Sequence, residues 1–468
     1  MTGYALWSME RPARPNWVVP VGPTGTTPTL VQGKFTSTNT HADESTAPTT
    51  IGLPNNTLSG NCCILCVQQD PTSSANSVSD NLSSGIWSLA VSLNGASVRQ
   101  EIWVGLNCPS GINEIKVTHN GGSGIDTQYA FYEFYNIAHA SALDGTSTGG
   151  AFTPGSNGDL VFVYGAQTSG SAVSTWTPAS GFTLLHGMNY NSGTDQACFA
   201  QYEVQTTATS VTPSISGSSG TLQYLGIALK AASAGTAPAG GIRIVSVQGY
   251  NFYGGASGLS GPFTLQFPTT GNLIHMSWVA LTTTASPSGL ASMSDTAGNT
   301  WTTNGSPQTC SLDSSAGCTQ HAHAQGAGAS ATNKITFNCD QIATLSTTHV
   351  ELYDIIGAQS PSYDTASSTF GKQTSSGNLA TASVTPSGSN ELVINSTGID
   401  SHDLSGVTGS YLSDISIAPN FDGGGSGLSS DDGYAHAYNV SSSSTCTYTT
   451  QNNSAGVQGW VSYSSAYQ

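Results

Sequence analysis

Charge is what this sequence has least of. Only 7% of its 468 residues are charged, and 26 acidic residues outnumber nine basic ones, giving a formal net charge of −17. An ordinary soluble domain carries about 25% charged residues. Nine basic side chains are too few to form a cationic patch that would neutralise phosphates. The composition therefore argues against nucleic acid as a partner.

Long apolar runs and helical periodicity are missing as well. No run approaches the roughly 18 apolar residues of a membrane span, so we expect no membrane partner. There are no heptads, which argues against coiled coils and helical bundles. Disorder also fits poorly, because aromatic residues make up 8% of the chain and disordered chains are poor in them.

The N-terminus lacks the order of a secretory signal peptide, since Arg11 and Arg14 follow the apolar residues instead of preceding them. We therefore expect either a protein that leaves the cell by lysis, as a virion component does, or one whose leader has been removed.

The cysteines number nine, so at least one has no partner within the chain. Cys62, Cys63 and Cys66 lie in an apolar run, NCCILCVQ, which predicts small buried side chains. Cys310 and Cys318 flank a short Ser/Gly turn, which would suit a hairpin disulfide.

What the chain does have is internal similarity. Short motifs recur at nearly constant spacing: Val31-Gln32-Gly33 as Val247-Gln248-Gly249, Asp80 as Asp295, Glu133 to Ile137 as Glu351 to Ile355, and Asp159-Leu160-Val161 as Glu391-Leu392-Val393. The spacing grows from about 216 to 232 residues along the chain. This pattern predicts two homologous domains, 25–232 and 242–468, joined by a flexible linker at 233–241 and preceded by an arm at 1–24.

Each repeat consists of short β-branched and aromatic runs, such as CFAQYEV, LQYLGIAL, KITFN and VELYDI, separated by Gly, Asn, Asp and Ser clusters. These runs predict strands and turns. We expect an all-β protein made of two tandem β-sandwich, jelly-roll-like domains. Asp295 to Asn299 should form a tight hairpin turn, with Trp301, and Trp87 in the first repeat, covering the end of the core.

The repeats resemble a family of repeated β-sandwich domains found in phage structural proteins and bacterial surface proteins. The resemblance lies in an Asp-x-x-Gly-Asn-x-Trp-Thr hairpin, here Asp295 to Thr302, followed by Glu351-Leu352-Tyr353-Asp354-Ile355 and Asn390-Glu391-Leu392-Val393. The first repeat departs from it, because Asp80 to Trp87 has an extra residue and lacks Gly-Asn. The resemblance implies a fold and an exposed setting, and it brings no catalytic residues.

Two groups of residues are candidate metal ligands. His321 and His323 would share one face of a strand, and with Asp313 or Cys318 nearby they could bind a transition metal; otherwise they are a solvent-facing pair. Asp422, Asp431 and Asp432 lie in a Gly-rich stretch that could hold calcium, or could form a solvated connection. We assign no cofactor to the chain.

Catalytic signals are weak. Gly145 to Gly149 fits G-x-S-x-G, but the strand and helix of a nucleophile elbow are not predicted around it. Glu133 and Glu351, at matching repeat positions, favour a structural role over the paired carboxylates of a glycosidase. We predict that the chain is not an enzyme.

The first 24 residues carry large apolar groups on a proline-rich segment that cannot form its own core. We predict an anchoring arm, with Tyr4, Trp7, Arg11, Arg14 and Trp17, that binds neighbouring subunits.

The leading hypothesis is therefore a structural protein on a virion surface, a phage head or tail decoration, fibre or appendage, and a homo-oligomer. The alternative is an extracellular adhesin or carbohydrate-binding protein, in which Trp176 or Tyr190 would stack on host-surface glycans.

Overall fold

The computed structural model describes most of the chain. The described residues are 26–38, 49–69, 71, 74–95, 98–120, 127–167, 173, 175–188, 197–217, 220–253, 261–282, 289–311, 316–339, 345–373, 377–400, 402–408, 410–413, 430–452 and 458–468.

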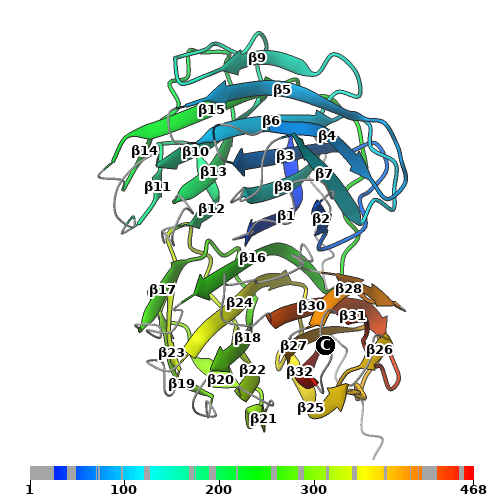
Figure 1. Ribbon diagram of the computed structural model, residues 1–468. Coiled ribbons are helices and arrows are strands. Elements are labelled where there is room, and N and C mark those ends of the chain that lie inside the picture. Colours follow the sequence, from blue (N-terminus) through cyan, green and yellow to red (C-terminus); the bar gives the residue numbers. More distant parts are fainter. Residues whose placement is uncertain are drawn as a thin grey trace, which may run out of the picture.

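This part of the chain is built from strands (Figure 1). It contains 32 strands and no helix, which confirms the all-β class. No described segment is a helix long and apolar enough to cross a membrane. The runs CFAQYEV and LQYLGIAL form β13 (Cys198–Val204) and β15 (Leu222–Leu229), as predicted.

The first eight strands form a two-layered unit, called unit 1. One layer has the order β1-β8-β3-β6-β5 and the other the order β2-β7-β4. The strands are β1 (Thr29–Thr38), β2 (Thr49–Gly52), β3 (Cys62–Gln69), β4 (Ser74–Asp80), β5 (Trp87–Asn94), β6 (Arg99–Gly105), β7 (Glu114–Asn120) and β8 (Thr127–Tyr135).

Unit 3 repeats this arrangement. Its layers have the orders β16-β24-β18-β22-β20, with β21 also on β22, and β17-β23-β19. The strands are β16 (Arg243–Tyr253), β17 (Phe263–Gln266), β18 (Leu273–Thr282), β19 (Leu290–Asp295), β20 (Trp301–Thr303), β21 (Gln308–Ser311), β22 (Ala316–Gln325), β23 (Lys334–Cys339) and β24 (Leu345–Ile356).

Units 2 and 4 follow units 1 and 3 along the chain. In unit 2 the layers are β9-β15-β10-β13-β12 and β11-β14, and in unit 4 they are β25-β32-β27-β30-β29 and β26-β31-β28. The remaining strands of unit 2 are β9 (Leu143–Ser147), β10 (Leu160–Gln167), β11 (Thr177–Pro178), β12 (Thr183–Met188) and β14 (Ile215–Ser216). Unit 4 contains β25 (Tyr363–Gln373), β26 (Gly377–Ala380), β27 (Glu391–Asp400), β28 (His402–Thr408), β29 (Leu412–Ser413), β30 (Ser430–Val440), β31 (Thr447–Asn452) and β32 (Gln458–Tyr467).

One strand order is therefore used four times. When strands are counted within a unit, β21 is left out of unit 3 and the bridge at Phe152 is counted as the second strand of unit 2, the larger layer reads 1-8-3-6-5 in all four units, and the smaller layer reads 2-7-4 in units 1, 3 and 4. Unit 2 differs only in its second strand, where an isolated bridge joins Phe152 to Val211. Each sequence repeat thus contains two sandwiches where we expected one.

A left-handed residue precedes the third strand of every unit. Gly60, Gly158, Gly271 and Asn390 have φ values of 81°, 87°, 84° and 64°, a region that glycine and asparagine tolerate best. A polar residue follows each of them: Asn61, Asp159, Asn272 and Glu391. The shared turn is a local sequence requirement common to all four units.

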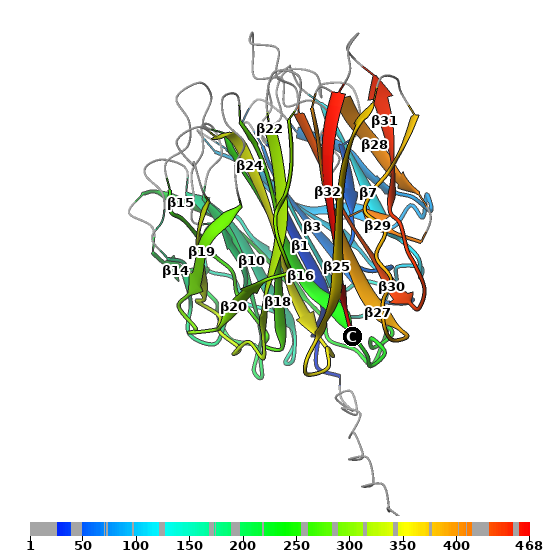
Figure 2. The same cartoon turned by 90° about the horizontal axis from the view of Figure 1, so that it is seen from below.

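The two repeats are joined through one parallel strand pair. Residues 33–36 of β1 lie opposite residues 246–249 of β16, which merges the larger layers of units 1 and 3 into one eleven-stranded sheet. In Figure 1 this junction lies between the upper half, blue to green, and the lower half, green to red. Figure 2 shows that the axes of most long strands of the two repeats are roughly aligned, although neighbouring strands are mostly antiparallel.

Units 2 and 4 cover opposite faces of this sheet. Ile64 and Phe134 of unit 1 share a buried cluster with Phe162 of unit 2. Tyr353 of unit 3 shares another with Leu392 of unit 4. Because both faces are covered, β3 is buried at every residue, which is why its sequence is an apolar run without alternation. Cys62, Cys63 and Cys66 are buried, as predicted.

The predicted turn forms in both repeats, but it is not a hairpin, because it connects strands of different layers, β4 to β5 in unit 1 and β19 to β20 in unit 3. Asp295 accepts hydrogen bonds from the Asn299 N–H (2.9 Å) and from the Trp301 indole (3.3 Å). Asp80 accepts one from the Trp87 indole at 3.1 Å. Both tryptophans pack against the core of their own unit. The extra residue in the first repeat leaves this contact unchanged.

The segment 233–241 is tied to unit 1. The Thr236 N–H donates to Asn61 Oδ1 at 2.7 Å, and the Asn136 N–H donates to the Ala234 carbonyl at 2.7 Å. Gly235 has φ 83°, and a Cβ added there would lie 2.3 Å from Asn61 Oδ1. The linker expected to be flexible is held in one path by these contacts.

Candidate functional site

Several predicted site residues lie outside the described residues: Tyr4, Trp7, Arg11, Arg14, Trp17, Tyr190, Asp313 and Asp422. The backbones of Asp431 and Asp432 belong to β30, opposite Ile399 and Gly398, so these two are strand residues and not part of a loop. Their side chains, like that of Cys310, are outside the described part, and the calcium site and the Cys310–Cys318 bridge stay predictions.

His321 and His323 lie on one face of β22, as their spacing indicates, but this face is covered by unit 4. Both side chains are buried, so the expectation of a solvent-facing pair is wrong. Cys318 belongs to the core on the other side of β22, because residues an odd number apart on a strand point to opposite faces. It is therefore no companion ligand for His321.

The ring nitrogens of these histidines meet side-chain oxygens. His321 Nε2 lies 2.8 Å from Ser396 Oγ, and His321 Nδ1 lies 3.0 Å from Ser465 Oγ; both serines belong to unit 4. His323 Nδ1 lies 2.5 Å from Asn304 Oδ1. Asn304 in turn donates to Ser465 Oγ at 2.8 Å.

A third histidine, His275 on β18, extends this network. Its Nδ1 lies 2.5 Å from the Tyr467 hydroxyl and its Nε2 lies 2.8 Å from Ser277 Oγ. Ser277 Oγ is also 3.2 Å from His321 Nε2. The polar network therefore connects unit 3 to unit 4 beside their shared apolar cluster.

Burial keeps the three rings neutral. It lowers the pKa of His321 to about 3 and that of His323 to about 4. The pKa of His275 lies well below its usual value because of burial, with repulsion from His321 and His323 adding to the effect. A neutral ring offers one donor and one acceptor, which suits an interface of hydroxyls and amides.

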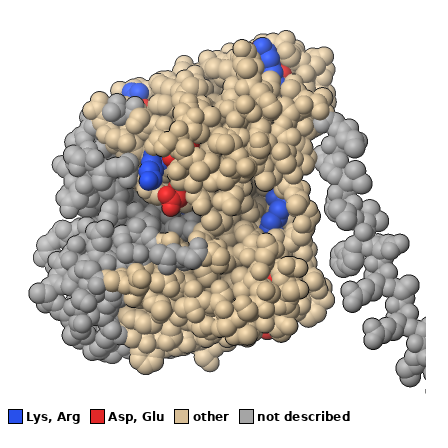
Figure 3. All heavy atoms as spheres, turned by 90° about the vertical axis from the view of Figure 1, so that its right-hand side faces the viewer, with Lys and Arg blue, Asp and Glu red and all other residues tan. Residues whose placement is uncertain are grey.

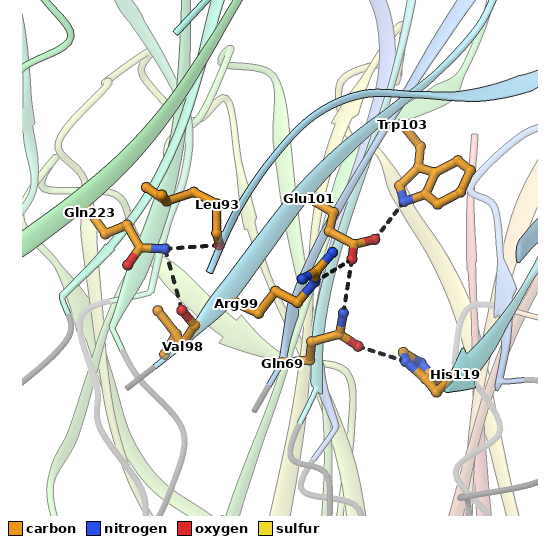
Figure 4. A network of polar contacts seen from close by, with 8 residues as sticks. All are labelled: Gln69, Leu93, Val98, Arg99, Glu101, Trp103, His119 and Gln223. Atoms are coloured by element: carbon orange, nitrogen blue, oxygen red, sulfur yellow. Dashed lines mark hydrogen bonds and ion pairs between the residues drawn. The ribbon is translucent and has the colours of Figure 1, made fainter. Parts of the chain in front are cut away.

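A second network closes one end of unit 1 (Figure 4). Glu101 Oε1 accepts hydrogen bonds from Arg99 Nε at 2.7 Å and from Gln69 Nε2 at 3.4 Å, and Oε2 accepts one from the Trp103 indole at 2.9 Å. Gln69 Oε1 lies 2.8 Å from His119 Nδ1. The buried carboxylate is thus neutralised by Arg99, and the chain of contacts crosses from β6 through β3 to β7.

Neighbouring groups complete this end of the unit. His119 Nε2 lies 2.6 Å from the Tyr129 hydroxyl, and burial lowers the pKa of His119 to about 4. Gln223 of unit 2 donates to the carbonyls of Leu93 and Val98, on either side of the turn between β5 and β6. Our sequence reasoning missed this network, although Arg99, Glu101 and Trp103 have the i, i+2 spacing of residues sharing a strand face.

Glu133 and Glu351 match in sequence but not in space. Glu133 faces the core of unit 1, where it accepts hydrogen bonds from the Leu58 N–H (2.8 Å) and Gln32 Nε2 (2.6 Å). In unit 3 the equivalent contact is made by Asp354, which accepts from the Thr270 N–H at 2.7 Å. Glu351 is three positions earlier and therefore on the other face of the strand. Burial raises the pKa of Glu133, and that of Asp354 to about 6.

Acid pairs occur at matching places in units 2 and 4. Burial and the neighbouring Asp144 raise the pKa of Asp159 to about 6. Burial alone would raise the pKa of Asp144. A hydrogen bond with Asp159 and the Lys230 ammonium, whose Nζ lies 3.3 Å from Asp144 Oδ1, outweigh burial, so the pKa of Asp144 is lowered. In unit 4, burial and Asp364 raise the pKa of Glu391. Asp159 and Glu391 both follow the left-handed turn before the third strand, which explains the repeated acid-Leu-Val motif.

Two further sequence signals, and one cysteine spacing that our sequence reasoning missed, have structural explanations. Ser147 of the G-x-S-x-G match lies on β9 and donates its hydroxyl to the Gly150 carbonyl. Trp176 is buried, with its indole donating to the Met188 carbonyl at 2.8 Å, so it offers no platform for a sugar. Cys63 and Cys66, spaced as C-x-x-C, face opposite sides of β3.

Charged side chains are sparse on the surface as well. On the face drawn in Figure 3, Lys, Arg, Asp and Glu appear as a few small spots among other residues, some of them blue beside red. Within the described part of the chain, no group of three or more His, Cys, Asp or Glu side chains is placed to hold a metal ion.

Comparisons with known proteins found few similarities. No family model matches the chain, and no curated protein matches it. Among solved structures, a xanthan lyase from Paenibacillus aligns with 10% identity and a TM-score of 0.15 over 94% of this chain. The chain spans 51% of the length of that lyase. Similarity at this level carries no argument about fold or activity.

Proposed function

We propose that the chain is a non-enzymatic structural protein on the outer surface of a virion, such as a head or tail decoration, a fibre or an appendage of a phage. The observation that carries this proposal is the construction of the body: four sandwich units are fused by one continuous sheet and by buried contacts between units. Such a body suits a building block that must keep its shape while exposed.

The use of the titratable groups supports the same proposal. His321, first considered as a metal ligand, pairs with two serines across the interface between units 3 and 4, and His323 pairs with Asn304 of its own unit. Glu101 pairs with Arg99 in the closed end of unit 1. Both sets of side chains hold strands and units together.

The finer description of the fold belongs to this proposal. The order 1-8-3-6 facing 2-7-4 is that of two interleaved Greek keys, and we assign each unit to the jelly-roll-like sandwiches. The motif from Asp295 to Thr302, with its Asp295–Trp301 contact, supports the resemblance of unit 3 to the repeated domains of phage structural and bacterial surface proteins, while unit 1 departs from the motif.

The segment 1–24 is the proposed anchor, binding other subunits of the assembly. The decisive experiment is to look for the chain in purified particles by mass spectrometry and to locate it by antibody labelling. We expect a constant copy number per particle and labelling on the outside. Presence on cells and absence from particles would overturn the proposal in favour of an adhesin.

Deletion of residues 1–24 tests the arm. We expect the shortened chain to melt at the same temperature as the full chain and to be missing from particles. Incorporation at full occupancy would show that the arm is not the anchor.

A further inference from the structure

Two cysteine side chains meet inside unit 1. Cys63 lies on β3 and Cys108 lies in the turn that follows β6, and both are buried in the core between the two layers of the unit. The thiol of Cys63 forms a hydrogen bond with the thiol of Cys108. Both are free thiols, as are the other cysteines whose side chains the structure describes.

The backbone holds these two residues side by side. The Cys108 N–H donates to the Asn61 carbonyl at 2.9 Å, and the Cys108 carbonyl accepts from the Gly60 N–H at 2.8 Å. These hydrogen bonds continue the pairing of β3 with β6, in which Cys63 lies opposite Gly105. Because paired backbone fixes both residues, their thiols stay in contact in the folded chain.

The neighbouring cysteines of β3 face away from this pair. Cys62 and Cys66 lie an odd number of residues from Cys63, so their side chains point to the opposite face of the strand, into the cluster shared with unit 2. Within the described part of the chain, the core between the layers of unit 1 contains Cys63 and Cys108 and no third cysteine. Each of the two is therefore the nearest partner that the core offers to the other.

We propose that Cys63 and Cys108 form a disulfide bond when the chain folds in an oxidising medium. The thiolate of one cysteine attacks a low-molecular-weight disulfide, glutathione disulfide, and releases one glutathione; the thiolate of the other cysteine then displaces the second glutathione and closes the S–S bond. The two thiols lose two protons and two electrons in all, and two molecules of glutathione are formed. The bond joins β3 to the turn after β6 and encloses β4, β5 and β6 in one covalent loop.

Folding is the stage at which this bond forms. In the folded chain, the hydrogen bond with Cys108 and then burial raise the pKa of the Cys63 thiol well above its usual value. A thiol attacks a disulfide only as the thiolate, so the folded, reduced chain reacts slowly. The redox state of the medium during folding therefore decides whether unit 1 carries the bond. This inference goes beyond the proposed function, because it holds for any exposed setting of the chain.

Peptide analysis of the full chain tests the bond directly. The chain is synthesised in a cell-free system, once with oxidised and reduced glutathione and once with dithiothreitol, and the folded fraction is treated with iodoacetamide and digested with pepsin. Mass spectrometry should find the Cys63 and Cys108 peptides linked, and two hydrogens lighter than their sum, in the glutathione sample. Alkylation of both cysteines in that sample overturns the proposal.

Cys108→Ala tests which residues carry the effect on stability. A disulfide that closes a long loop stabilises the folded state, so we expect the unmodified chain made with glutathione to melt about 3–8 °C above the chain made with dithiothreitol. Cys108→Ala should melt at one temperature under both conditions. Cys446→Ala, at a buried cysteine of unit 4, is the control and should keep the difference.

A difference that persists in Cys108→Ala would overturn the proposal, since it would place the stabilising bond elsewhere. The peptide analysis uses the unmodified chain and does not depend on the folding of either variant. Neither measurement bears on whether the chain is found in particles, so this proposal and the proposed function fail separately.

Discussion

At the scale of single residues, a carboxylate that fixes a turn recurs in this chain. Asp80 and Asp295 each accept backbone N–H groups of their own turn and a tryptophan indole. The acceptor, the turn and the aromatic ring lie within eight residues, so the contact could be predicted from the sequence. The residues against which the turn packs could not be predicted in this way.

Asp295→Ala removes this acceptor. It leaves the Asn299 N–H and the Trp301 indole without their partner, so we expect a loss of about 1–2 kcal/mol in the free energy of unfolding. Urea denaturation measures the change. Ser294→Ala, at the exposed neighbouring position, should have little effect. Equal stability of the two variants would contradict the assigned role.

The raised pKa of Asp159 predicts how the stability of the folded chain depends on pH. Its pKa is raised to about 6 by burial and by Asp144, so the folded chain holds this proton more tightly than the unfolded chain. The resulting stabilisation is complete below the ordinary pKa of an aspartate, about 3.9, and is lost as pH rises through about 6.

Asp159→Asn mimics the protonated form. We expect it to be more stable than the unmodified chain at pH 7.5, and the difference to shrink toward pH 4.5. Thermal melts across this range test it, with Glu114→Gln on β7 as the control. A difference that does not depend on pH would show that Asp159 stays ionised.

At the scale of elements, the strand period of two decides which face each side chain covers. The matching of Glu133 with Glu351 places the two residues on opposite faces, and Asp354 takes the structural position of Glu133. When the sequence alignment and the structural alignment differ by one or three residues, the aligned side chains lie on opposite faces of the sheet. Strand positions were therefore predictable and strand faces were not.

Between elements of different units, side chains act as backbone partners. Gln266 on β17 of unit 3 accepts a hydrogen bond from the Trp176 N–H and donates one to the Trp176 carbonyl, both at 2.7 Å. The Gln266 amide thus satisfies both backbone groups of a buried residue in unit 2.

Gln266→Ala leaves these two backbone groups unsatisfied. Each costs about 1–3 kcal/mol when buried, so we expect a loss of about 2–4 kcal/mol in the free energy of unfolding. Chemical denaturation followed by tryptophan fluorescence measures it. Gln325→Ala, which removes a hydrogen bond on the exterior, is the control. A loss as small as that of the control would contradict the contact.

At the scale of the whole molecule, the interface between units 3 and 4 depends on neutral histidines. Their pKa values are lowered by burial, so the unfolded chain takes up protons below about pH 6.5 while the folded chain does not. Stability is therefore complete above pH 6.5 and is lost as pH falls toward 3 to 4.

His321→Gln tests this dependence. The variant keeps a donor and an acceptor at the interface but cannot be protonated, so its stability should fall less steeply between pH 7 and 4.5 than that of the unmodified chain. Denaturant midpoints at several pH values measure the slope. His139→Gln, at an exposed histidine, should leave the slope unchanged, and an unchanged slope in His321→Gln would contradict the prediction.

The sequence by itself determined the all-β class, many strand positions and the tight turns at Asp80 and Asp295, and it predicted two repeats. These features depend on residues close together in the chain, where turn chemistry and β-propensity act directly. The sequence signal of four units was confined to one left-handed turn residue and the polar residue after it in each unit, which is too little to detect in a chain with 55 glycines.

Only the tertiary structure decided that each repeat holds two sandwiches, that β1 pairs with β16, and that His321 and His323 face another unit. These outcomes depend on which strand faces are covered. In a sheet buried on both sides, polar and apolar residues no longer alternate to show the outer face. Burial, which lowers the pKa of the histidines and raises that of Asp159, arises from residues far apart in the chain and had no local pattern from which it could be predicted.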